Sequence, residues 1–153
     1  MSIFTNRIML ATDGSREAWL ASKAAIELAK KTDSELHVVL VSPTLSAPEY
    51  DAIGLAIEEP REEIKREGRR RLDEQVKHLR DAGGIVTRAH FRMGRPAESI
   101  ITVAGEMGAG LILMGSRGLG GLSRALIGRV AASVVRHAHC TVLIVREEEE
   151  AVS

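Results

Sequence analysis

Glycine spacing between residues 111 and 130 is the feature of this sequence that most directly suggests chemistry. The stretch LILMGSRGLGGLSRALIGRV begins as an apolar run, passes through several glycines, and then enters a helical pattern that contains Gly128. Glycines between a strand and a helix let backbone N–H groups approach an anion, and the N-terminus of the helix adds partial positive charge. A flexible surface loop without a ligand accounts for the glycine count equally well.

Two familiar phosphate-binding motifs do not fit this segment. A P-loop requires Lys and then Ser or Thr after its second glycine, and the sequence has Gly and Leu there. The dinucleotide-binding pattern G-x-G-x-x-G would begin at Gly118, but a serine stands at its third glycine. The spacing that does occur is G-x-x-G, nine residues, G, formed by Gly115, Gly118 and Gly128.

A second group of reactive side chains, His137, His139 and Cys140, lies in the segment HAHC. A zinc site needs about four ligands, and we find no second Cys/His pair to complete one. We therefore expect no structural metal and interpret the histidines as complementing the dipole at a helix end. Cys140 is the single cysteine, which excludes an internal disulfide. No pattern in the sequence indicates a catalytic residue.

Alternating strand and helix patterns position these residues. Apolar runs predict strands over 8–12, 36–41, 85–91, 111–114 and 141–145, and the third run alternates as an edge strand does. Helical patterns run from a Ser15 cap to about residue 31 and then over 60–82, 96–107 and 123–137. This order predicts an α/β fold with a parallel sheet and helices on both faces. Gly68, on the apolar face of the second helix, indicates close packing on the sheet.

Composition narrows the class of protein. A chain of 153 residues fits one domain. Its Lys+Arg and Asp+Glu counts are both 21, so there is no electrostatic footprint for nucleic acid, and we interpret GRRR at 68–71 as part of an ion-paired helix face. No apolar segment reaches the roughly 18 residues of a membrane span. We expect a cytoplasmic protein in which residues 42–59 form a long functional loop and the acidic tail is solvated.

Four segments in this order resemble the universal stress protein family, in its ATP-binding branch. They are ATDGS after the first strand, GRPAESI at the third helix, GLILMGSRG on the fourth strand, and VVRHAHCTVLIV at the end. The resemblance implies a five-stranded sheet of order 3-2-1-4-5, an adenine nucleotide alpha-hydrolase-like, Rossmann-like fold. Strands one and four are then neighbours, and ligands in such sheets bind at the carboxyl ends of the strands at this switch point.

The resemblance also implies which residues would hold the nucleotide. Asp13 would accept hydrogen bonds from the ribose or adenine side, and it equally suits a helix cap. Val41, at the end of the second strand, would pack against adenine or simply belong to the core. Backbone N–H groups after the fourth strand would contact ribose and phosphates, and Gly128, within the last helix, would let phosphate approach. The full set is Ala11, Thr12, Asp13, Val41, Met114, Gly115, Ser116, Arg117, Gly118, Gly128, Arg129 and Val130.

Arg129 departs from the family pattern, which has Ser or Thr after the last glycine of the motif. An arginine there binds phosphate as a charged fork, fills the pocket, or points to solvent. The resemblance implies a homodimer paired through the edge strand Thr141–Val145 that binds ATP, with or without magnesium, and acts as a stress-response adaptor. Two alternatives remain: a dimeric interaction protein without nucleotide, and a slow ATP hydrolase.

Overall fold

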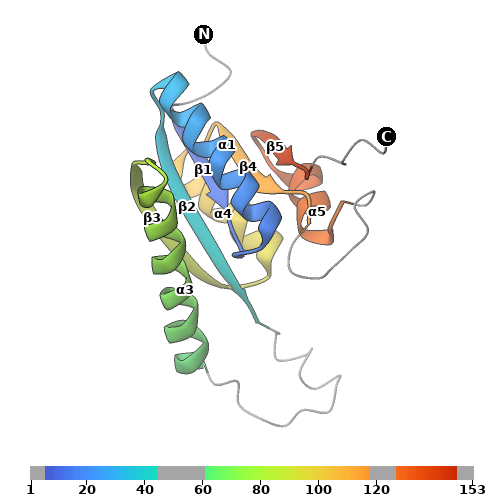
Figure 1. The fold of residues 1–153 in the computed structure, drawn as a ribbon. Helices are drawn as coiled ribbons and strands as arrows, with labels where there is room; N and C mark the ends of the chain where they lie inside the picture. The colour runs from blue at the N-terminus through green and yellow to red at the C-terminus, as the bar shows by residue number, and fades with distance from the viewer. Residues whose placement is uncertain (1–5, 45–60, 118–126, 148–153) are drawn as a thin grey trace, which may run out of the picture.

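The computed structural model describes residues 6–44, 61–117 and 127–147 and shows strands alternating with helices (Figure 1). The strands are β1 (Arg7–Ala11), β2 (Glu35–Pro43), β3 (Val86–Gly94), β4 (Leu111–Gly115) and β5 (Thr141–Val145). The helices are α1 (Arg16–Thr32), α3 (Arg61–Asp81), α4 (Pro96–Met107) and α5 (Arg129–His137). All pairings among these strands are parallel, and the order β3-β2-β1-β4-β5 confirms the predicted fold class.

Helices cover both faces of the sheet, and each face has its own apolar cluster. α1 and α3 pack on the face that carries Leu10 and Val38, whereas α4 and α5 pack on the face that carries Met9 and Val39. Neighbouring residues of one strand enter opposite clusters because successive side chains of a strand point to opposite faces. β1 and β4 are central and buried on both faces, which is why they are uninterrupted apolar runs in the sequence.

Gly68 lies where α3 comes closest to the sheet, as the sequence predicts. A Cβ atom at this position would lie 2.2 Å from Cε2 of Phe91 and 2.6 Å from Oγ of Ser42. Neither atom can retreat freely, because Phe91 belongs to β3 and Ser42 is buried in β2. Glycine therefore sets the distance between α3 and the β2–β3 pair.

Helix α1 begins and ends at recognisable caps. The Ser15 hydroxyl oxygen accepts a hydrogen bond from the Ala18 N–H at 3.2 Å, which confirms the predicted N-cap. The helix ends at Asp33, whose left-handed backbone (φ 51°) lets its N–H reach the last carbonyls of the helix. Both α1 and α3 run from the carboxyl end of the sheet toward its amino end, so the first turn of α1 lies beside the ends of β1 and β4 (Figure 1).

Strand β2 is longer than the sequence pattern indicated. It ends at Pro43 rather than at Val41, because its pairing with β3 continues from Leu36 opposite Val86 to Pro43 opposite Gly94. Backbone pairing of this kind does not depend on apolar side chains, so Ser42 and Pro43 extend the strand. The predicted long loop over 42–59 was therefore wrong in its first two residues, and its remainder from 45 onward lies outside the described residues.

Two other predicted boundaries were wrong for identifiable reasons. Ile85 precedes β3 and is 80% exposed, because the Gly83–Gly84 turn that closes α3 delivers the chain to the sheet only at Val86. The helix predicted over 123–137 begins at Arg129, and Gly128 is its N-cap with an extended backbone (φ −64°, ψ 160°). Glycine favours caps over helix interiors; residues 123–126 lie outside the described residues.

The two edges of the sheet differ in character. β3 has only its first residue buried, and Arg88 and Arg92 project from it beside His90, which confirms the predicted half-exposed edge strand. β5 has the sequence TVLIV without a charge, and its Leu143 is 42% exposed. One edge is therefore charged, and the other is apolar.

Candidate functional site

The switch point of the sheet lies between β1 and β4, which pair from Ile8 opposite Leu111 to Leu10 opposite Leu113. The chain leaves β1 toward β2 on one side and leaves β4 toward β5 on the other. The two turns that follow these strands therefore diverge at the carboxyl ends of neighbouring strands, where doubly wound sheets bind ligands.

The turn after β1 is fixed by its own side chains and by α3. Thr12 donates its N–H to the Val39 carbonyl at 3.0 Å. The Asp13 carboxylate accepts the Ser15 N–H at 2.9 Å, and the Asp13 carbonyl accepts a hydrogen bond from Arg71 at 2.6 Å. Asp13 thus shapes the turn just before the α1 cap, which is Ser15, and one of its carboxylate oxygens already has a partner.

Arg71 departs from the interpretation of GRRR at 68–71 as part of an ion-paired helix face. Arg70 does pair with Glu67 and Glu74 on the same helix. Arg71 instead reaches the turn after β1, where Gln75 of the same helix also lies within 3.4 Å of the Thr12 hydroxyl. The sequence gives no direct signal for this brace, because the contact joins residues about sixty positions apart.

The turn after β4 is organised around Glu17, a residue that sequence reasoning did not select. Glu17 lies in the first turn of α1 and is 5% exposed. Its carboxylate accepts hydrogen bonds from the Ser116 hydroxyl, from the Arg117 N–H at 3.2 Å, and from the Arg117 guanidinium, whose Nε lies at 2.7 Å. Ser116 itself is 2% exposed. A carboxylate thus receives the Arg117 donors that the resemblance assigns to phosphate.

The Glu17 network is electrically balanced within the described residues. Arg117 also faces Glu147 at 3.9 Å, and Glu147 pairs with Arg16 at 2.8 Å. Burial by itself raises the pKa of Glu17, but the hydrogen bonds from Arg117 and Ser116 and the Arg117 charge outweigh burial and lower the pKa below 4.5. Glu17 is therefore a carboxylate at neutral pH, and it balances the positive charge of Arg117.

Gly115 is required by this packing. A Cβ atom on Gly115 would lie 2.9 Å from Cβ of Glu17 and 3.1 Å from the backbone nitrogen of Ala18. The first motif glycine therefore allows α1 to approach β4 closely, in addition to any contact with a ligand.

Gly128 joins the second half of the glycine motif to the first. Its N–H donates to the Ser116 carbonyl at 2.7 Å, and the Ser116 N–H donates to the Val145 carbonyl at 3.0 Å. Because Gly128 is the N-cap of α5, this bond places the N-terminus of α5 beside the end of β4. Arg129, the first residue of the helix, is exposed. Gly118 lies outside the described residues.

Four apolar residues of the predicted site belong to one cluster on the α4–α5 face. Ala11 and Met114 are buried there, and Val41 and Val130 pack against it while partly exposed. They come from β1, β4, β2 and α5, respectively. The structure thus brings together an apolar side and a polar side at the switch point, on opposite faces of the strand ends.

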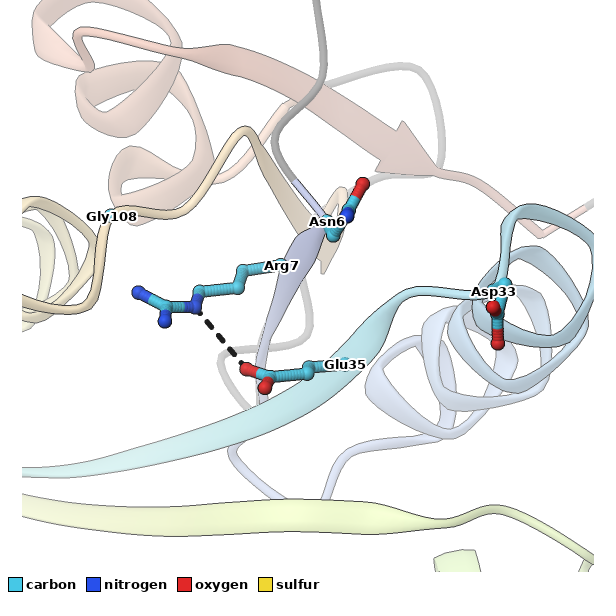
Figure 2. A pocket seen from close by; sticks show the side chains of 5 residues that line it. All are labelled: Asn6, Arg7, Asp33, Glu35 and Gly108. Atoms are coloured by element: carbon cyan, nitrogen blue, oxygen red, sulfur yellow. Dashed lines mark ion pairs between the residues drawn. The ribbon is translucent and has the colours of Figure 1, made fainter.

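Two open pockets occur among the described residues, one at the amino end of the sheet and one that borders the turn after β1. One, of about 500 Å³, is at the amino end of the sheet and is lined by Asn6, Arg7, Asp33, Glu35 and Gly108. Figure 2 shows Arg7 and Glu35 extending toward each other across this pocket, with an ion pair of 3.2 Å between them. The other, of about 610 Å³, lies between α1 and α3 beside Trp19 and His78.

The amino-end ion pair continues into two stacked histidines. His37 Nε2 lies 3.1 Å from Glu35 Oε2, and His37 Nδ1 lies 3.2 Å from Nε2 of His90 on β3. The rings stack with centroids 5.5 Å apart. Burial first, and then the charges of His37, Arg92 and Arg88, lower the pKa of His90, so this ring favours its neutral form.

Metal, thiol and membrane chemistry each place requirements on the His, Cys, Asp and Glu side chains or on the length of apolar helices in the described part of the chain. No three His, Cys, Asp or Glu side chains there are placed to share a metal ion. Burial raises the pKa of the Cys140 thiol, which lowers its thiolate fraction at neutral pH. Among the helices of residues 6–44, 61–117 and 127–147, none has an apolar stretch long enough to cross a membrane.

Sheet order and helix placement define a doubly wound α/β protein, a class of protein that binds ligands at the carboxyl ends of the strands at the switch point, which here lies between β1 and β4. The model of the universal stress protein family matches residues 5–146. The chain is 36% identical to universal stress protein MJ0531 of Methanocaldococcus jannaschii, over 94% of this chain and 84% of that protein. It is 34% identical to universal stress protein YxiE of Bacillus subtilis, over 92% and 99%. The chain belongs to the universal stress protein family.

Solved structures share the fold over nearly the whole chain. A universal stress protein from Burkholderia pseudomallei has a TM-score of 0.63 at 32% identity and covers 96% of this chain and 99% of its own. A universal stress protein in complex with cAMP has a TM-score of 0.65 at 24% identity, with coverage of 95% and 99%. One from Archaeoglobus fulgidus in complex with dAMP has a TM-score of 0.60 at 19% identity, with coverage of 95% and 100%.

Proposed function

We propose that this protein binds an adenine nucleotide, ATP by the resemblance of its motifs, at the switch point between β1 and β4. The observation that carries the proposal is the 2.7 Å hydrogen bond from the Gly128 N–H to the Ser116 carbonyl. This bond joins Gly128 to the turn that contains the first part of the glycine motif, although nine residues separate the two parts in the sequence. It also places the N-terminus of α5 at the switch point, where its partial positive charge favours an anion.

Different residues around the switch point would contact the adenine, the sugar and the phosphates. The apolar group of Ala11, Val41, Met114 and Val130 would pack against adenine, and Asp13 would accept a hydrogen bond from the sugar or base. Gly115 and Gly118 would offer backbone to ribose and phosphates, and Gly128, which has no side chain, would let phosphate approach α5. Arg129, exposed at the start of α5, would add a charged fork to phosphate. Magnesium, where bound, would neutralise phosphate charge.

Proteins that share this fold support an adenine ligand. The neighbours crystallised with cAMP and dAMP match more than nine-tenths of this chain in structure. Their fold therefore accommodates adenine nucleotides, and the site geometry described above lies at the position where such folds bind ligands.

The binding proposal is tested by release and titration. We expect denatured protein to release bound nucleotide, and calorimetric titration with ATP, with and without magnesium, to show one site. Gly128→Ala should abolish binding while the protein stays folded, because alanine accepts the extended backbone of Gly128 but crowds the phosphate. Gly105→Ala is the matched control, since a Cβ at Gly105 meets no atom within 4 Å. Binding that survives Gly128→Ala would refute this site, and product analysis over hours tests for hydrolysis.

We further propose that the protein is a homodimer paired through β5 and acts as a cytoplasmic stress-response adaptor. The supporting observation is the apolar edge strand Thr141–Val145, whose Leu143 is 42% exposed. Its outer edge pairs with no other strand of the described residues, and such an edge suits a second copy. We expect Leu143→Lys to shift the protein to monomer on a sizing column. Ile85→Lys, at an apolar residue that is 80% exposed but outside β5, should leave the dimer intact. A dimer unaffected by Leu143→Lys would exclude this interface.

A second candidate is a dimeric interaction protein that binds no nucleotide. The observation in its favour is the engagement of Arg117 and Ser116 by Glu17, which gives these donors a partner within the chain. Absence of released nucleotide, together with no binding at millimolar ATP, would favour this candidate.

A further inference from the structure

We propose that Glu17 is an internal competitor for phosphate and makes the site select adenine nucleotides with one phosphate over ATP. This inference rests on the proposed function and specifies its ligand class. The Glu17 carboxylate accepts hydrogen bonds from the Ser116 hydroxyl, the Arg117 N–H and the Arg117 guanidinium. The Arg117 N–H and guanidinium among them are donors that the resemblance assigns to phosphate. A phosphate must either displace Glu17 or bind beside a buried negative charge.

The electrostatic repulsion between the Glu17 carboxylate and a ligand increases with the negative charge of the ligand. Among the described residues, Arg117 and Arg16 are matched by Glu17 and Glu147, so these four side chains together carry no net charge. Each additional phosphate oxygen anion is repelled by a carboxylate that is only 5% exposed and therefore weakly screened. A triphosphate suffers this repulsion more than a monophosphate does.

The positive groups of the described residues that are left to attract a ligand, the N-terminus of α5 and Arg129, match the charge of a single phosphate. The N-terminus of α5 contributes a partial positive charge, and Arg129, its first residue, is an exposed guanidinium. Together they match about one phosphate group. Adenine and ribose contacts are the same for a monophosphate and a triphosphate, so the ratio of the two affinities isolates the contribution of the phosphates.

The experiment measures dissociation constants of AMP and ATP for the full chain in EDTA, by calorimetry. We expect the wild type to bind AMP at least as tightly as ATP. Glu17→Gln removes the charge and keeps one of the two acceptor oxygens, so it can still accept either the Arg117 guanidinium or the Ser116 hydroxyl and the Arg117 N–H. We expect it to tighten ATP by about tenfold and AMP by much less. Magnesium should shrink the ATP gain, because it neutralises phosphate charge; a purely structural effect would not respond to magnesium in this way.

Glu27→Gln on the same helix is the matched control, since Glu27 pairs with Lys31 on the exposed face, and it should change neither constant. Glu147→Gln should shift the ratio in the same direction by less, because Glu147 lies 3.9 Å from Arg117. This variant decides the question if Glu17→Gln does not fold. A folded variant whose ATP-to-AMP ratio equals that of the wild type would overturn the inference and leave the proposed function intact.

Failure of this inference can be distinguished from failure of the proposed nucleotide binding. ATP binding by Glu17→Gln alone, with none by the wild type, would support the inference in its strongest form. No binding of either nucleotide by the wild type or by the folded variants would overturn the proposed function and, with it, this inference.

Discussion

Two Arg–Glu ion pairs connect elements at opposite ends of the sheet, and their surroundings differ sharply. Glu17 and Arg117 join α1 to the turn after β4 at the carboxyl end, with side chains 6% and 14% exposed. Arg7 and Glu35 join β1 to β2 at the amino end, with side chains 51% and 45% exposed. The same chemistry is thus buried at the candidate site and exposed at the other end.

The difference in exposure indicates how much each ion pair contributes to stability. Removing one partner of a buried pair leaves a charge without compensation, whereas exposed pairs contribute little. The Glu17 pair therefore holds the candidate site in shape. The Arg7 pair borders an open pocket, and Arg7 also donates to the Met107 carbonyl at 2.9 Å at the end of α4.

The largest effect is expected from breaking the buried pair. Glu17→Ala should lower the free energy of unfolding by about 3 kcal/mol, because Arg117 and the Ser116 hydroxyl lose their acceptor. Urea unfolding followed by circular dichroism measures this loss. Glu27→Ala, which removes an exposed partner of Lys31 on the same helix, should have a far smaller effect. Equal effects of the two variants would contradict the distinction between buried and exposed pairs.

A smaller decrease in the free energy of unfolding is expected from a substitution that crowds the buried Glu17–Arg117 pair. Gly115→Ala places a methyl group 2.9 Å from Cβ of Glu17, so α1 must shift away from β4 at a cost of about 1–3 kcal/mol. Gly105→Ala, where a Cβ meets open space, should instead stabilise α4 by about 0.5–1 kcal/mol. Opposite signs in thermal unfolding would confirm the close approach of α1, and a neutral Gly115→Ala would argue against it.

Lowering the pH should reduce the free energy of unfolding in two separate pH ranges, one through His90 near the amino end of the sheet and one through Glu17 at the carboxyl end. The lowered pKa of His90 means that the unfolded chain binds a proton near pH 6.5 before the folded chain does, so stability falls as the pH drops below about 6.5. The lowered pKa of Glu17 produces a second fall below 4.5, as the pH passes through the folded value.

Urea unfolding at a series of pH values separates these two steps. His90→Gln should remove part of the upper step, and Glu17→Gln should remove part of the lower one. One variant that removed both steps would show that the two ends are not independent.

The smallest effect is expected from breaking the exposed pair. Glu35→Gln should move the urea midpoint much less than Glu17→Ala does, because solvent already stabilises both charges of the Arg7–Glu35 pair. The small shift should fade further at high salt. A loss as large as that of Glu17→Ala would show that the Glu35–His37 contact, rather than the Arg7 pair, is structurally important.

Most of the fold is predictable from the sequence because it depends on local patterns. Uninterrupted apolar runs predicted the central strands, and alternation predicted that β3 is an edge strand. Gly68 was predicted as a close contact because a glycine on the apolar face of a helix leaves room for a neighbouring element. The strand order followed from the family resemblance, which the family model confirms over residues 5–146.

The polar side of the site was less predictable because it depends on contacts across the chain. Glu17 in the first turn of a helix already suits the helix dipole, and nothing local indicates a partner one hundred positions away. Gly128 fell within a helical spacing of apolar residues, and its role as N-cap depends on the bond to Ser116. The roles of the site residues toward a ligand remain predictions.

The charged edge strand β3 has a consequence for how many copies can assemble. Pairing through β5 would leave a β3 strand at each outer end of the joined sheet. There, Arg88 and Arg92 of one copy would meet the same arginines of the next, and like charges oppose strand addition. Growth into a fibre along the sheet would thereby be blocked, so the asymmetry of its edges would limit the assembly to a closed pair.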